Sequence, residues 1–292
     1  MTVMTVPTGA PSHPGQLARF GRFARRNPTM LLGAAILIFF LGVAIAAPLF
    51  AGDPMLKLPT RRLQPPSREL WFGTDQLGQD IFARTVYGAR VSLVVGFSVA
   101  AISILVGMTI GLFAGYYRRF DGIVMRLMDG LMAIPAILLA IAMVALNQGS
   151  IAIVVAAISI PELPRVVRLV RSIVLSVKEL PFVEAARACG ARTPRILFRH
   201  IMPSTIAPLI VQASYICASA ILVEASLSFL GAGVPPEIPS WGNLIASSRL
   251  YLARAPWTIF CPAVALALVV LAVNLFGDGL RDRLDPRLSR RL

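Results

Sequence analysis

One short stretch of this sequence gathers charged side chains that could recognise a partner. It reads EAARACGARTPRILFRHIMP, residues 184–203, and holds one glutamate, four arginines and one histidine. The chain has only two histidines, His13 and His200, so no Ser/His/Asp or Cys/His set can be assembled for nucleophilic catalysis. It also lacks a G-x-x-x-x-G-K-S/T phosphate loop, and its three cysteines form no CxxC zinc motif. The chemistry that the stretch supports is recognition, without a cofactor or metal.

The stretch predicts two short helices. Residues 184–189 are alanine-rich and favour helix, and Gly190 fits a left-handed C-terminal cap. Thr193 can cap the second helix, with Pro194 at its first position. Pro203 is expected to end this helix before the next apolar segment begins.

The second helix has an apolar stripe beside charged side chains. Ile196, Leu197 and Ile201 fall near one face, and Arg195, Arg199 and His200 lie elsewhere. Such a pair of helices suits a groove on another protein. The alternative is a pair that lies on lipid headgroups, with its arginines against anionic lipid.

The composition indicates which class of protein carries this stretch. Of 292 residues, 57% are hydrophobic and 14% charged, whereas charged residues make up about a quarter of a soluble domain. Long uncharged runs reach the roughly 20 residues that span a bilayer as a helix. The net charge of +14 is better explained by a basic cytoplasmic side than by nucleic acid. We therefore predict an all-α, polytopic membrane protein.

Six membrane spans are expected, at about 30–50, 91–117, 123–147, 150–170, 204–230 and 256–279. The fourth is the weakest because it contains Pro161, Glu162 and Pro164, and a re-entrant segment is an alternative. With both termini inside, 20 of the 28 lysines and arginines lie on the cytoplasmic side.

This topology divides the chain into five parts. They are a cytoplasmic N-terminal tail (1–29), the first transmembrane helix (30–50), an external loop (51–90), a five-helix core (91–280) with a cytoplasmic insert at about 171–203, and a basic cytoplasmic C-terminal tail (281–292).

Three glycines are candidates for close helix packing. Gly107, Gly111 and Gly115 repeat every four residues and therefore share one helix face, where a neighbouring backbone can approach closely. Packing within this chain is favoured over a contact with another subunit.

Three further features carry local predictions. Pro135 should kink the third span. Asp129 is expected to pair with Arg126 at i, i+3 spacing. Glu224, near the outer end of the fifth span, is a functional candidate and can reach the external interface.

Residues 184–203 resemble the EAA signature of permease subunits of bacterial ABC importers. The matching residues are Glu184, Ala185, Ala186, Gly190 and Pro203, while His200 and Met202 depart from the pattern. Four other segments are similar to C-type subunits of dipeptide, oligopeptide and nickel permeases: 72–93, 126–135, 224–245 and 276–288.

The resemblance implies the type I importer permease fold and several partners. These are a homologous B-type permease subunit, two ATPase subunits that bind ATP and magnesium, an extracytoplasmic binding protein and membrane lipid. The chain itself would be no enzyme and would lie in the bacterial plasma (inner) membrane. Its insert would be the coupling helix that contacts the ATPases, through Glu184, Ala185, Ala186, Arg187, Gly190, Arg195, Arg199 and Pro203.

Peptide is the expected substrate, with nickel chelates, glutathione and other small solutes as alternatives. A secondary carrier acting alone is a different possibility. It is disfavoured because ion-coupled carriers need intramembrane charges and often show internal repeats, whereas these spans are nearly free of charge. A third possibility is a membrane anchor for an assembly that does not transport a substrate.

The charge distribution makes a first testable prediction. A cysteine at Ser67, in the 51–90 loop, should react with a membrane-impermeant thiol reagent added to intact cells, because the loop faces outward. Labelling is measured before and after lysis. Reaction only after lysis would contradict the predicted orientation.

Overall fold

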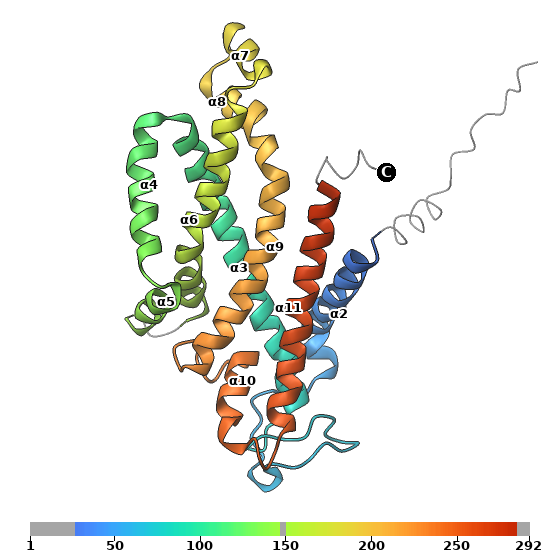
Figure 1. Ribbon diagram of the computed structural model, residues 1–292. Coiled ribbons are helices and arrows are strands. Elements are labelled where there is room, and N and C mark those ends of the chain that lie inside the picture. Colours follow the sequence, from blue (N-terminus) through green and yellow to red (C-terminus); the bar gives the residue numbers. More distant parts are fainter. Residues whose placement is uncertain (1–26, 147–149, 285–292) are drawn as a thin grey trace, which may run out of the picture.

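The protein is a bundle of long helices (Figure 1), seen in a computed structural model that describes residues 27–146 and 150–284. The described ranges contain no β-strand, so the all-α prediction is confirmed. Most of the two predicted tails, 1–29 and 281–292, lies outside the described residues, but the first four residues of the C-terminal one continue α11. The main helices are α2 (Pro28–Phe50), α3 (Ile81–Tyr116), α4 (Arg118–Ala133), α5 (Ala136–Ala145), α6 (Ile151–Val177), α7 (Pro181–Ala188), α8 (Thr193–Arg195), η2 (Ile196–Ile201), α9 (Met202–Phe229), α10 (Trp241–Ser248) and α11 (Trp257–Leu284).

Four helices in the described part of the chain are long and apolar enough to cross a membrane. They are α2, α3, the continuous helix Thr193–Phe229 and α11, and the bent pair α4–α5 would make a fifth. The fourth predicted span, 150–170, corresponds to α6. It is long enough, at 27 residues, but it carries one glutamate and three arginines, so length and composition alone do not establish it as a span.

The third predicted span is broken into two helices. Ile134 and Pro135 leave the helical conformation, and α4 and α5 meet at 85°. Proline disfavours helical geometry in the residue before it, and Ile134 accordingly has φ −93° and ψ 127°. The predicted bend at Pro135 is confirmed.

At the fourth predicted span, α6 is one continuous helix through Pro161 and Pro164, so the re-entrant alternative is wrong. The start of the second predicted span differs from expectation. α3 begins at Ile81 instead of residue 91, because the Asp80 carboxylate accepts a hydrogen bond from the Phe82 N–H (2.9 Å) and caps the helix there. Burial raises the pKa of the Asp80 carboxyl, and the N–H groups of Phe82 and Ala83 act against that shift.

The most extensive contact between described helices joins α3 to α6. The glycines of α3 face valines of α6 one for one: Gly107 against Val166, Gly111 against Val170 and Gly115 against Val174. A methyl group added at any of these glycines would lie 2.6–2.7 Å from the facing valine side chain. We call this contact the glycine–valine seam; it lies within the chain.

The other helices are arranged around this pair. α2 packs along α11, and α9 lies between α3 and α11 (Figure 1). Gly279 near the end of α11 contacts Met30 near the start of α2. The first and last described helices therefore meet on the same side of the bundle. At one end α7 and α8 project, while α10 and the long loop before α3 lie at the other (Figure 1).

The seam makes a second testable prediction. Gly111→Leu should destabilise the protein by about 1–3 kcal/mol or more, because overpacking forces the two backbones apart. Gly130→Leu on α4 is the matched control, since a Cβ atom added there has no neighbour within 4 Å beyond its own helix backbone. The measurement is the yield and thermal stability of detergent-solubilised protein. Equal stability of the two variants would contradict the seam.

Candidate functional site

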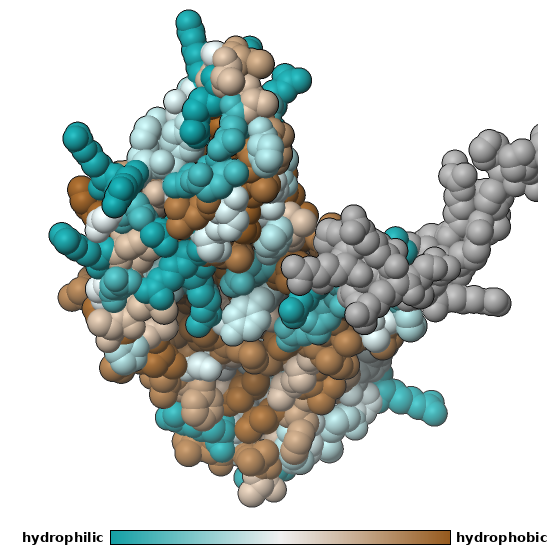
Figure 2. Space-filling model, turned by 45° about the horizontal axis from the view of Figure 1, so that its top comes forward, coloured by the Kyte–Doolittle hydropathy of each residue, from teal (hydrophilic) through white to brown (hydrophobic). Residues whose placement is uncertain are grey.

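The predicted docking stretch forms a projection at one end of the molecule, which we call the tip (residues 178–201). Figure 1 shows α7 and α8 beyond the ends of α6 and α9, which the tip connects. Figure 2 shows hydrophilic residues gathered toward this end, with apolar residues covering much of the remaining surface in that view. The tip is therefore a polar element mounted on an apolar body.

The tip is attached to the bundle by its apolar side chains. Val183 of α7 and Ile196, Leu197 and Ile201 of η2 are buried and belong to the main hydrophobic core. The predicted apolar stripe of the second helix is thus confirmed as a buried face. Because Val183 holds α7 against η2, the opposite face of α7 is free to contact another molecule.

Gly190 ends α7 in the predicted left-handed conformation, with φ +79°. The Gly190 N–H donates to the Arg187 carbonyl and the Ala191 N–H donates to the Ala186 carbonyl, both at 3.0 Å. This pair of bonds is the Schellman motif. The expected cap at Thr193 is wrong: Thr193 is already helical and makes no side-chain cap.

Pro203 does not end the helix, contrary to expectation. Residues 196–201 wind as a π-helix, and the Met202 N–H donates to the Leu197 carbonyl five residues earlier. Proline has no N–H and clashes with the carbonyl four residues before it. The wider π turn lies just before this proline, and the helix continues through it to Phe229.

The exposed face of the tip combines aromatic and charged side chains. Phe182 is 48% exposed and Phe198 is 51% exposed. Both lie in the tip, which also displays the exposed signature residues Glu184, Ala185, Arg187, Gly190, Arg195 and Arg199. Pro203 is exposed just beyond the tip, and Ala186 is partly buried. Aromatic residues and arginine are enriched at protein interfaces. Sequence reasoning missed both phenylalanines, although their position beside the signature could have indicated them.

Polar contacts tie the base of the tip to neighbouring helices. The Lys178 ammonium donates to the Gly115 carbonyl (3.3 Å), at the end of the glycine–valine seam. Arg171 forms a two-pronged ion pair with Asp121 of α4. α6 is therefore held to both α3 and α4 where it enters the tip.

Asp129 does not pair with Arg126 as predicted. Its carboxylate accepts a hydrogen bond from Arg168 of α6 at 2.5 Å. The packing of α4 beside α6 supplies a partner across the helix contact, which spacing along one helix cannot reveal. Arg165, Arg168 and Arg171 recur every three residues on α6. This spacing was the sequence feature that could have indicated ion pairs between α6 and a neighbouring helix.

Glu224 lies at the opposite end of the molecule and is fully buried, with 0% of its surface exposed. Its carboxyl group bonds to the Ser228 hydroxyl (2.9 Å) and the Ser92 hydroxyl (3.4 Å). The expectation that it can reach the external interface is therefore wrong. Instead it links α9 to α3, close to where Trp241 of α10 donates to the Thr85 carbonyl (3.0 Å).

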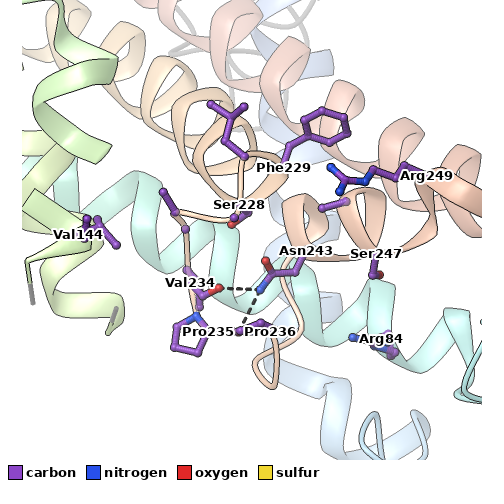
Figure 3. A pocket seen from close by; sticks show the side chains of 16 residues that line it. Arg84, Val144, Ser228, Phe229, Val234, Pro235, Pro236, Asn243, Ser247 and Arg249 are labelled. Carbon is purple, nitrogen blue, oxygen red and sulfur yellow. Dashed lines mark hydrogen bonds between the residues drawn. The ribbon is translucent and has the colours of Figure 1, made fainter. Parts of the chain in front are cut away.

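A cavity of about 680 Å³ opens at this end, between the end of α5, the end of α9, the following loop and α10 (Figure 3). Asn243 fixes the loop by donating to the carbonyls of Val234 and Pro235. Arg84 lines the cavity while paired with Asp75 (2.6 Å). No cluster of metal-ligating side chains occurs in the part of the chain that the structure describes.

The fold and the tip define a multi-pass helical membrane protein that presents a projecting, partly polar tip at one end. The chain belongs to the family described as the inner membrane component of binding-protein-dependent transport systems, whose profile matches residues 107–290. It is thus a component of a transport system and not an enzyme. Systems of this kind generally combine such permeases with ATPase subunits and a substrate-binding protein.

Individual relatives extend the match over nearly the whole chain. A probable peptide ABC transporter permease protein of Sinorhizobium fredii is 60% identical over 270 residues, covering 92% of this chain and 93% of that protein. The dipeptide transport system permease protein DppC of Alkalihalophilus pseudofirmus is 46% identical over 267 residues, covering 91% and 88%.

A solved structure shares the fold. The MetNI methionine ABC transporter, in an inward-facing conformation, has a chain that superposes with a TM-score of 0.54 at 18% identity, covering 70% of this chain and 98% of that one. This likeness supports the type I ABC importer permease fold.

The Schellman turn makes a third prediction. Gly190→Val should loosen the end of α7 by about 1–2 kcal/mol, because a residue with a Cβ is disfavoured in the left-handed region. A steric clash of the added Cβ atom is not the cause, since that atom would have no neighbour within 4 Å. Gly190→Asn is the control, because asparagine tolerates this conformation. Faster hydrogen exchange in α7 of the valine variant alone is the expected result; equal exchange in both variants would contradict it.

Proposed function

We propose that this chain is the C-type permease subunit of an ATP-driven peptide importer, and that its tip docks on the ATPase subunits. In this assembly a homologous B-type permease completes the translocation pathway. Two ATPase subunits bind ATP and magnesium, and an extracytoplasmic binding protein delivers the substrate. Membrane lipid surrounds the apolar helices.

The observation that carries the proposal is the construction of the tip. One side is anchored through Val183, and the other displays two half-exposed phenylalanines together with the charged residues of the EAA signature. A lipid surface explains the arginines, but it gives no role to Glu184, whose carboxylate would be repelled by anionic headgroups. A protein groove can accommodate the aromatic, acidic and basic groups together.

A tip on the cytoplasmic side agrees with the distribution of basic residues along the chain. The basic residues predict the tip and both termini on the cytoplasmic side. The meeting of Gly279 with Met30 supports termini that share one side of the membrane. In the proposed orientation the cavity beside Asn243 opens outward, toward the delivering protein.

Peptide is the substrate class that the relatives favour. The two described above are named for peptide and dipeptide transport, and they align with more than nine-tenths of this chain. Nickel chelates and glutathione remain the alternatives expected from the wider family. Uptake assays with each substrate, using the cognate binding protein, distinguish them.

A charge reversal tests the docking. Glu184→Lys should still insert in the membrane but should lose most ATPase co-purification and ATP-driven peptide uptake, because a like-charge contact at an interface costs several kcal/mol. The matched control for ATPase recovery is Glu237→Lys, which reverses an exposed acid at the opposite end, away from the tip. The measurements are ATPase recovery on the purified complex and uptake in reconstituted vesicles. Wild-type values for Glu184→Lys would refute the assignment of the tip.

A further inference from the structure

α6 has two faces of opposite character. Its valines pack into the glycine–valine seam, whereas Arg165 and Arg168 point away from the core with 52% and 45% of their side chains exposed. Arg165 lies near the middle of α6 (Ile151–Val177), and Tyr215 lies near the middle of α9 (Met202–Phe229). Because Arg165 lies beside Tyr215, an exposed cation sits next to the middle of α9, within a helix long and apolar enough to cross the membrane, and not wholly on the cytoplasmic side where the charge count had placed it.

Arg165 is held in place by two neighbours. Its guanidinium donates to both carboxylate oxygens of Glu162, at 3.0 and 3.1 Å. The guanidinium carbon also lies 5.7 Å from the centre of the Tyr215 ring, within the range of a cation–π contact. Glu162 is largely buried behind the arginine, with 12% of its side chain exposed. The charge is thus balanced from within the chain, and the arginine remains half exposed.

This exposure indicates a watery environment. Arginine facing lipid near the bilayer centre is costly, and intramembrane charges almost always face a bundle interior or a water-filled cavity. Burial against the second permease would call for an acid from that subunit, but Glu162 already supplies the countercharge. We propose that Glu162, Arg165 and Tyr215, here called the mid-membrane cluster, line the aqueous translocation pathway, where Arg165 transiently binds the carboxylate of a passing peptide.

The mid-membrane cluster suits transient binding of a passing peptide better than tight binding. A peptide carboxylate must compete with Glu162 for the Arg165 guanidinium, which weakens its binding. Conduction needs sites that are favourable enough to enter and weak enough to leave. The carboxylate specificity rests on the proposed function, because it assumes a peptide substrate; the watery location does not.

Thiol accessibility tests the location without assuming a substrate. In a complex whose native cysteines Cys189, Cys217 and Cys261 are replaced by alanine, Tyr215→Cys should react with a charged methanethiosulfonate reagent. Leu271→Cys is the matched control, because Leu271 is also half exposed near the middle of its helix but lies on α11. A thiol in lipid stays protonated and unreactive. Absence of reaction at Tyr215→Cys overturns the proposal.

A paired neutralisation tests the carboxylate site. Glu162→Gln with Arg165→Gln removes both charges together, so no unpaired buried charge is left to unfold the chain. The complex should still assemble, and its maximal uptake of a dipeptide should fall about ten-fold, as expected for loss of one charge-assisted hydrogen bond. Uptake of a dipeptide amide that the binding protein also captures should change little.

The control for this experiment is Asp121→Asn with Arg171→Gln, which neutralises another ion pair of α6. It should leave the ratio of dipeptide to amide uptake as in the wild type. An unchanged ratio in the Glu162/Arg165 double variant refutes the carboxylate site. If that double variant fails to assemble, the Glu162–Arg165 pair serves to hold subunits together, and the carboxylate site is also refuted. If the wild type takes up no peptide at all, the proposed function fails, while the thiol result still decides the location.

Discussion

The close contact between α3 and α6 is the constraint on which the rest of the structure depends. Lipid offers no hydrophobic force to bring two apolar helices together, so their association relies on van der Waals packing at short range. Three glycines at four-residue spacing make that approach possible. With its valine face fixed against α3, α6 must turn its arginines outward, and its end presents the tip. The seam thus orients both the tip and the mid-membrane cluster.

Features encoded by a few neighbouring residues could be predicted from the sequence. The left-handed Gly190, the break at Pro135 and the buried stripe of the second tip helix each follow from local sterics or from spacing along one helix. The family motif at 184–203 is equally local. For this reason most exposed charged residues of the tip could be named from the sequence, whereas the exposed Phe182 and Phe198 were missed.

Features set by contacts between helices could not be predicted in this way. Asp129 had a suitable partner at i, i+3, but packing offered Arg168 on another helix. The burial of Glu224 depends on Ser92, which is 132 positions away in the chain. Pro203 was expected to stop a helix because the rule assumes α geometry, and the π turn before it removes that assumption. Each of these differences arises where tertiary structure provides an alternative to a local rule.

Because of how the tip is connected in the chain, its movement would be transmitted to the helices that line the proposed pathway. The tip follows directly on the end of α6 and includes the first turns of the Thr193–Phe229 helix, and these two helices carry Arg165 and Tyr215. Val183 and the buried residues of η2 make the tip one packed unit, so a force applied to α7 reaches both helices together. The π turn at 196–201 lies on one of these two routes, and such turns occur frequently at functional sites. A shift of the tip by bound ATPases would therefore change the relation between α6 and α9 at the level of the cluster, where a 5.7 Å cation–π contact would respond to small displacements.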